Sequence, residues 1–160
     1  MTTTEEDRLQ LVQLLREDSL VLGEVTLASG ATASYYIDCR RTVMRPEGLA
    51  TCGRLIADRA GGLGADSVGG PVTAAIALAC AAISVPEGEG LRGFFVRQSR
   101  KEHGLQKWIE GAAEPGDRVL VVEDTVTTGG STVEAIAQAA DAPFEALTTV
   151  DEIYPDRPDA

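Results

Sequence analysis

The run of residues 119–132 constrains the fold more than any other part of this 160-residue chain. Four apolar residues, 119–122, precede Glu123 and Asp124, which lead into a Thr/Gly/Ser stretch and then into the helix-favouring segment 133–140. Such a sequence is typical of a buried parallel strand, a tight loop and a helix N-terminus. The run therefore predicts an α/β fold with a polar site at the end of a strand.

The rest of the chain alternates between helical and extended patterns. Helices are expected over residues 5–18, 46–59 and 72–83, and in the segment that ends near residue 141. Strands are expected over residues 20–27, 34–38, 66–71, 94–97, 119–122 and 146–151. Gly61-Gly62 is expected to end the second helix, and the strand over residues 66–71 is expected to end in a glycine turn at Gly69-Gly70. The alternation predicts one domain, residues 1–160, with a parallel sheet and crossover helices.

Composition narrows the class of protein. The net charge of −11, from 25 acidic and 14 basic residues, argues against a nucleic-acid-binding surface. No apolar run is long enough to span a membrane, and the acidic N-terminus is unlike a secretory signal. Cys39, Cys52 and Cys80 are few, odd in number and widely spaced, which favours reduced thiols and a cytoplasmic location without a zinc site.

The loop after residue 122 has the chemistry of a phosphate cradle. Small residues, hydroxyls and backbone N–H groups stand where the dipole of the following helix is positive. Glu123 and Asp124 would repel a phosphate if they faced it, so they are better explained as acceptors for a diol or as partners of a ligand-borne metal ion. A site that binds a phosphate beside a diol is suited to a ribose 5-phosphate ligand.

A second segment, 97–104, concentrates cations on an acidic protein. It contains Arg97, Arg100, Lys101 and His103, lacks apolar periodicity and ends at a glycine, so it is expected to be a mobile loop. Clustered cations indicate a ligand with several negative charges, such as a diphosphate.

Three motifs together resemble a known family. Residues 119–131 closely resemble the 5-phosphoribosyl 1-diphosphate signature of the type I phosphoribosyltransferases. Residues 97–111 resemble the catalytic loop of the orotate phosphoribosyltransferases, and residues 23–41 resemble their N-terminal block. The resemblance covers about residues 9–152. It implies a type I phosphoribosyltransferase-like fold: a parallel sheet flanked by helices, a small N-terminal hood (about 19–45) and a mobile catalytic loop (about 97–111).

The resemblance also implies a reaction. The ribose 5-phosphate group of 5-phosphoribosyl 1-diphosphate would pass to orotate, giving orotidine 5'-phosphate and diphosphate in pyrimidine synthesis. Magnesium would be held mainly by the ligand and water, with no direct protein ligand. A homodimer would share the loop, with Lys101 and His103 as catalytic residues reaching the neighbouring site. Tyr36, Thr127 and Glu152 would meet the base, with Tyr36 as a stacking face. Donor binding is expected of Arg97, Gln98, Arg100, Lys101, His103, Glu123, Asp124, Thr125, Val126, Thr127, Thr128, Gly129, Gly130 and Ser131.

Three positions depart from the family pattern. Gln98 replaces a basic residue, Gly69-Gly70 runs directly into Pro71-Val72 where the family has a longer diphosphate-contacting segment, and Glu152 replaces an arginine that contacts orotate. An anion beside a carboxylated base is repulsive by about 1 kcal/mol or more. Two alternatives stay open: a phosphoribosyltransferase for another base, and a non-catalytic regulator that binds the phosphoribosyl ligand.

Overall fold

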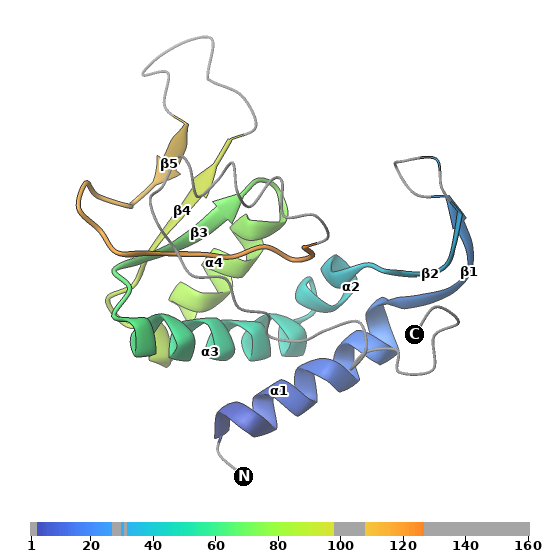
Figure 1. The fold of residues 1–160 in the computed structure, drawn as a ribbon. Helices are drawn as coiled ribbons and strands as arrows, with labels where there is room; N and C mark the ends of the chain where they lie inside the picture. Colours follow the sequence, from blue (N-terminus) through green and yellow to red (C-terminus); the bar gives the residue numbers. More distant parts are fainter. Residues whose placement is uncertain (1–2, 27–29, 31, 98–107, 127–160) are drawn as a thin grey trace.

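The computed structural model describes residues 3–26, 30, 32–97 and 108–126, which form two sheets and the helices around them (Figure 1). The helical elements are α1 (Thr3–Leu14), the π-helical turn η1 (Leu15–Ser19), α2 (Cys39–Val43), α3 (Pro46–Leu63), α4 (Ala74–Ser84) and the 3-10 turn η2 (Pro86–Gly88). The strands are β1 (Leu20–Thr26), β2 (Thr32–Ile37), β3 (Ser67–Pro71), β4 (Arg92–Val96), β5 (Ile109–Gly111) and β6 (Val119–Val121).

The central sheet has the strand order β5-β4-β3-β6. β3 pairs in parallel with both β4 and β6, so Ser67 lies opposite Arg92 on one side and Val119 on the other. This confirms the predicted parallel sheet. β5 was not predicted from the sequence; it pairs antiparallel with β4 and turns the edge of the sheet into a hairpin.

The glycines of β3 lie inside the strand, so the predicted glycine turn is wrong. Gly69 and Gly70 are buried and pair with Phe94 and Phe95 of β4. A Cβ on Gly69 would stand 2.1 Å from the Phe94 carbonyl oxygen, and one on Gly70 would stand 2.0 Å from the Val122 carbonyl oxygen. Glycine is needed at both places because neighbouring backbone occupies the space of a side chain.

α3 continues past the predicted stop. Gly61 and Gly62 are helical, and the helix ends at Leu63 because Gly64 takes the left-handed conformation at φ +62°. The Gly64 N–H donates to the Gly61 carbonyl and the Ala65 N–H donates to the Ala60 carbonyl, which satisfies the last turn.

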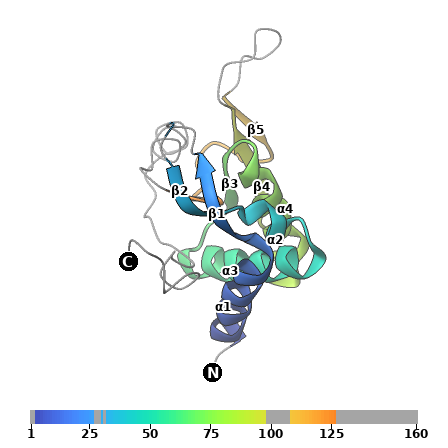
Figure 2. The same cartoon turned by 90° about the vertical axis from the view of Figure 1, so that its right-hand side faces the viewer.

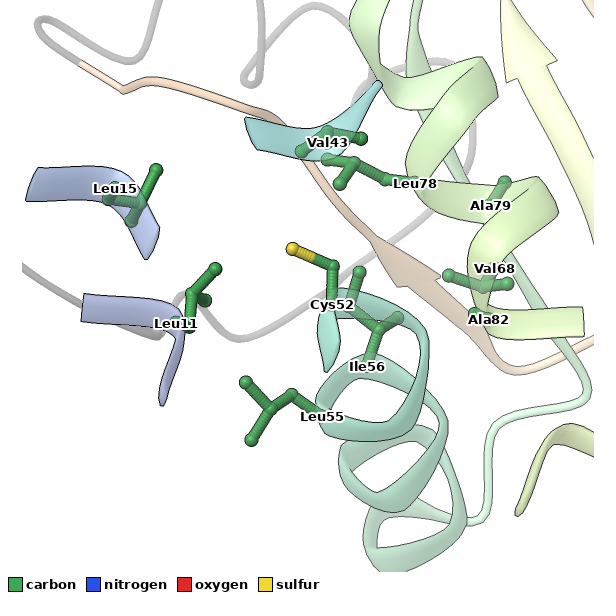
Figure 3. Close-up of a cluster of buried hydrophobic side chains, with 10 residues drawn as sticks. All are labelled: Leu11, Leu15, Val43, Cys52, Leu55, Ile56, Val68, Leu78, Ala79 and Ala82. Atoms are coloured by element: carbon green, nitrogen blue, oxygen red, sulfur yellow. The ribbon is translucent and has the colours of Figure 1, made fainter. Parts of the chain in front are cut away.

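The main core lies on one face of the central sheet. α4 packs on β3 and β4, α3 packs against α4, and α1 packs against α3 (Figure 1). The buried cluster, drawn in Figure 3, consists of Leu11, Leu15, Val43, Cys52, Leu55, Ile56, Val68, Leu78, Ala79 and Ala82. The cluster includes residues of α1, α2 and β3, so these elements share one apolar interior. Full burial of each large aliphatic side chain contributes about 1.5–3 kcal/mol to the stability of the fold.

The side chains of β6 and of the residue after it point alternately toward this core and toward a second, smaller cluster. Leu120 and Val122 pack toward the helices, whereas Val119 and Val121 pack with Phe94 on the other side of the sheet. The alternation is the two-residue period of a strand buried on both faces. It sets the side to which residues just beyond β6 project.

The N-terminal hairpin stands apart from the central sheet in Figure 1, and Figure 2 looks from the side of the hairpin, so β1 and β2 lie in front of the sheet there. β1 and β2 are antiparallel, with Leu20 opposite Ile37 and an irregularity between Leu22 and Val25. The Asp38 N–H donates to the Ser19 carbonyl at 3.0 Å and closes the base of the hairpin. α2 follows at once and connects the hairpin to the core.

Candidate active site

The predicted acid pair lies at the carboxyl edge of the central sheet. The Val122 N–H donates to the Gly69 carbonyl at 2.7 Å, which extends the β6 to β3 pairing by one residue. Glu123 and Asp124 follow and are half-buried, and Thr125 and Val126 are exposed. This edge is where parallel α/β sheets bind ligands, and these four residues lie at it; their contacts with a ligand stay a prediction.

α2 lies against this strand end. The Thr125 hydroxyl donates to the Cys39 sulfur at 3.7 Å. A small pocket beside it is lined by Arg40, Val43, Met44, Ala74, Ala77, Leu78 and Asp124. Asp124 thus projects to the helix side of the sheet, on the side of Val122, and shares a pocket with a cation that the sequence had not singled out.

Electrostatics at the start of α2 follow from these contacts. The Arg40 Nε donates to the Asp38 carboxylate at 2.7 Å, and this hydrogen bond lowers the pKa of Asp38. Burial raises the pKa of the Cys39 thiol, the hydrogen bond from Thr125 opposes that shift, and the charges of Asp124 and Asp38 add to it. Burial therefore favours the protonated form of the Cys39 thiol, which is the less reactive form.

Tyr36 presents a ring on the hairpin. Its side chain belongs to β2 and is 39% exposed, whereas Tyr35 points to the opposite face and is half-buried. The hydrogen bond to Asp38 chiefly raises the pKa of Arg40, and Tyr36 is near enough to add to that rise, so the hairpin and α2 lie close together here. An exposed ring at this place can stack on a planar ligand.

Arg97 lies just after β4, at the base of the predicted loop. Its Nη1 donates to the Glu110 carboxylate at 3.1 Å, and its backbone N–H donates to the Trp108 carbonyl at 2.9 Å. The pairing of β4 with β5 therefore brings the two ends of segment 98–107 together. Arg97 itself already has a carboxylate partner in this structure.

The remaining predicted site residues lie outside the described part of the chain. They are Gln98, Arg100, Lys101, His103, Thr127, Thr128, Gly129, Gly130, Ser131 and Glu152. Of the predicted site, the structure therefore places Tyr36, Arg97 and residues 123–126.

Arg40 and Cys39 are site neighbours that sequence reasoning missed. The available signal was the run Asp38-Cys39-Arg40-Arg41, two cations directly after an acid within a motif already assigned to the hood. Cys39 meets Thr125, which is 86 positions later in the chain. This approach depends on the packing of α2, which no local pattern reveals.

Other features of the structure do not add to this site. A larger groove of about 230 Å³ lies at the opposite edge of the sheet, where β3 and β4 begin, and its lining includes Asp66, Glu87 and Arg92. Within residues 3–26, 30, 32–97 and 108–126, no group of three or more His, Cys, Asp or Glu side chains is placed to hold a metal ion. Over the same residues, no helix has both the length and the apolar character needed to cross a membrane.

Comparison with known proteins extends the resemblance. No family model matches the chain. The orotate phosphoribosyltransferase of Corynebacterium glutamicum is 40% identical over 142 residues, which are 89% of this chain and 77% of that protein. The orotate phosphoribosyltransferase of Mycobacterium tuberculosis is 41% identical over 141 residues, which are 88% of this chain and 78% of the relative.

Solved structures agree with these relatives. The Mycobacterium tuberculosis enzyme in complex with Fe(III) dicitrate has a TM-score of 0.73 at 42% identity, covering 82% of this chain and 75% of that one. The same enzyme in complex with 5-phospho-alpha-D-ribosyl 1-diphosphate has a TM-score of 0.67 at 37% identity, covering 82% and 72%. The fold is thus the predicted type I phosphoribosyltransferase fold. Identity of about 40% over most of both sequences, the shared fold and the acid pair at the strand end make this chain a member of the orotate phosphoribosyltransferases, an enzyme family of phosphoribosyl transfer.

Proposed function

We propose that the protein transfers the ribose 5-phosphate group of 5-phosphoribosyl 1-diphosphate to orotate, releasing diphosphate and forming orotidine 5'-phosphate. The observation that carries this proposal is the position of Glu123 and Asp124 at the carboxyl edge of β6, directly before the Thr/Gly/Ser run. Two carboxylates are suited to accept hydrogen bonds from a ribose diol, and the run that follows is suited to a 5-phosphate.

The donor site would combine three kinds of contact. Glu123 and Asp124 would accept hydrogen bonds from the ribose hydroxyls. Residues 125–131 would surround the 5-phosphate with hydroxyls and backbone N–H groups. Arg97, with Gln98 and Arg100, would meet the diphosphate, and Arg97 would then exchange its bond to Glu110 for the ligand.

Lys101 and His103 would supply charge to the departing diphosphate. The bond from C1 of the ribose to the diphosphate oxygen breaks as the base nitrogen attacks, so negative charge grows on the leaving group. Cations placed at that oxygen lower the barrier because they interact more strongly with the transition state than with the ground state. We place these two residues in the site of the neighbouring subunit of a homodimer.

Magnesium fits the donor set only in part. Hard divalent cations prefer oxygen ligands, and at this edge the part of the chain that is described offers the two carboxylates of Glu123 and Asp124. We therefore assign magnesium mainly to oxygens of the bound donor and to water. The ion would offset charge on the diphosphate.

The base would lie against Tyr36, with Thr127 and Glu152 nearby. A planar ring stacks well on an exposed aromatic face, and Tyr36 is 39% exposed. Glu152 is an acid at the position where the family carries an arginine, which favours a second candidate: transfer to a base without a carboxylate.

The three free cysteines are consistent with a reducing, cytoplasmic setting.

A base panel tests the proposed function. The protein is mixed with the magnesium donor and, separately, with orotate, uracil, adenine, guanine or hypoxanthine, and diphosphate release is recorded. Orotate is expected to support turnover. Turnover with another base and none with orotate would move the assignment to the second candidate, and turnover with none of them would contradict phosphoribosyl transfer to any base in the panel.

A further inference from the structure

α2 places a cation near Asp124, the second residue of the acid pair. Arg40 and Asp124 line the same small pocket, with walls formed by α2 and α4. The Arg40 side chain is 62% exposed, and its Nε donates to Asp38 at 2.7 Å. A guanidinium has five N–H donors, so one bond to Asp38 leaves capacity for a second carboxylate.

The helix that carries Arg40 is fixed to the core. Thr42 is fully buried, and its hydroxyl lies 2.7 Å from the Ser19 hydroxyl and 3.2 Å from the Leu14 carbonyl. The backbone of Gly48 packs so closely on Thr42 that a Cβ there would stand 2.2 Å from the Thr42 carbonyl oxygen. Arg40 therefore projects from a backbone that η1 and α3 hold in place.

The strand end contacts the same helix. The Thr125 hydroxyl donates to Cys39, the residue before Arg40, so α2 and the segment after β6 are in direct contact. The hydrogen bond to Asp38 is the main reason that the Arg40 pKa is raised, and the charge of Asp124 adds a smaller contribution. The shared pocket therefore carries the link between Arg40 and Asp124, and the sign of the charges agrees with it.

A cation at this position would reduce the repulsion between the acid pair and the anionic donor. The donor carries a phosphate and a diphosphate, and Glu123 and Asp124 are both anionic. Like charges at this range repel, and a carboxylate without a fixed partner can rotate away from a diol. A neighbouring guanidinium offsets the repulsion and restricts the carboxylate.

We propose that Arg40 is a positioning residue of the donor site: from α2 it orients and partly neutralises the Asp124 carboxylate, which then accepts the ribose diol. The inference rests on the proposed function, because it takes Asp124 as the diol acceptor. Arg40 acts through Asp124 and makes no contact with the donor.

The first test is donor affinity. Calorimetric titration of the magnesium donor into Arg40→Ala should show affinity about two- to five-fold weaker, the range of a partly exposed ion pair. KM for the donor should rise by a similar factor while kcat changes less. Arg40→Lys should recover part of the loss because it keeps the charge. The matched control is Arg41→Ala, an exposed arginine on the same helix, which should bind as the parent does.

The second test is a double-mutant cycle with Asp124→Asn, with thermal melting of every variant as the check on folding. If Arg40 acts through Asp124, Arg40→Ala should have no further effect in the Asp124→Asn background. An equal loss in both backgrounds, or equal losses in Arg40→Ala and Arg41→Ala, would overturn the positioning role and leave the proposed function intact. Unchanged affinity in Asp124→Asn alone would instead overturn the diol assignment, and the positioning role with it.

Discussion

Gly70→Ala should damage both the fold and the donor site, because the added methyl group has no room. Its Cβ would stand 2.0 Å from the Val122 carbonyl oxygen and 3.1 Å from the Ala75 Cβ. An ordinary contact needs about 3.5 Å or more, so the backbone at Val122 must move away from β3 by over an ångström, and a shift of α4 would relieve only the closer approach to Ala75. Backbone on both sides makes either movement expensive.

The size of the effect follows from two contributions. Overpacking of a well-packed interior costs about 1–3 kcal/mol. Movement of β6 also weakens the hydrogen bond from the Val122 N–H to the Gly69 carbonyl, worth about 1 kcal/mol. The sum is about 2–4 kcal/mol, which for a chain of this size corresponds to a fall of roughly 5–15 °C in melting temperature.

The measurement is a thermal melt together with calorimetric titration of the magnesium donor. Gly62→Ala is the matched control, because that glycine is helical and exposed and a Cβ there meets nothing within 4 Å. Alanine should raise the melting temperature slightly at that site. Gly70→Ala with an unchanged melting temperature and unchanged donor affinity would refute the view that close β3 to β6 packing positions the acid pair.

Three further predictions concern the proposed site. Asp124→Asn, or Glu123→Gln, should weaken donor binding without unfolding the protein, since these acids are expected to face the diol and not the core; titration that finds parental affinity in both variants would remove the diol assignment. Lys101→Ala should lower turnover roughly 100-fold or more with little change in affinity for ribose 5-phosphate, which lacks the leaving group; parental turnover would show that this lysine has no catalytic part. Inactive Asp124→Asn and Lys101→Ala chains, refolded together in equal amounts, should recover about a quarter of parental diphosphate release if the loop acts across a two-fold dimer. Activity equal to the mean of the separate variants, with subunit exchange confirmed, would mean that each loop serves its own subunit.

Apolar runs in the sequence were the most predictable part of the fold. Residues 94–97 and 119–122 were expected as strands and occur as β4 and β6 within two residues, since a run of apolar β-branched and aromatic side chains has few other solutions. The predicted end of α3 was wrong. Gly61-Gly62 resembles a helix-terminating signal, yet the helix ends where Gly64 takes the left-handed conformation.

Features that depend on distant partners were not predictable. β5 has three residues and exists through its pairing with β4, where Gly111 lies opposite Phe94. The proximity of Arg40 to Asp124 arises from the packing of α2 between the hairpin and the core, across more than half of the sequence. The acid pair itself was predictable, because its place at a strand end follows from the local pattern alone.

Because β4 and β5 form a hairpin, the fold of the sheet depends little on the length of the segment between them. The Arg97 N–H bonds to the Trp108 carbonyl, so the chain leaves the sheet and returns to it at one point. For a closed loop, each doubling of length costs only about 0.6 kcal/mol in closure entropy. Insertions or deletions between these two residues would therefore change what the segment reaches while leaving the sheet below it unaltered. Related chains could diverge in loop length here at almost no expense in stability.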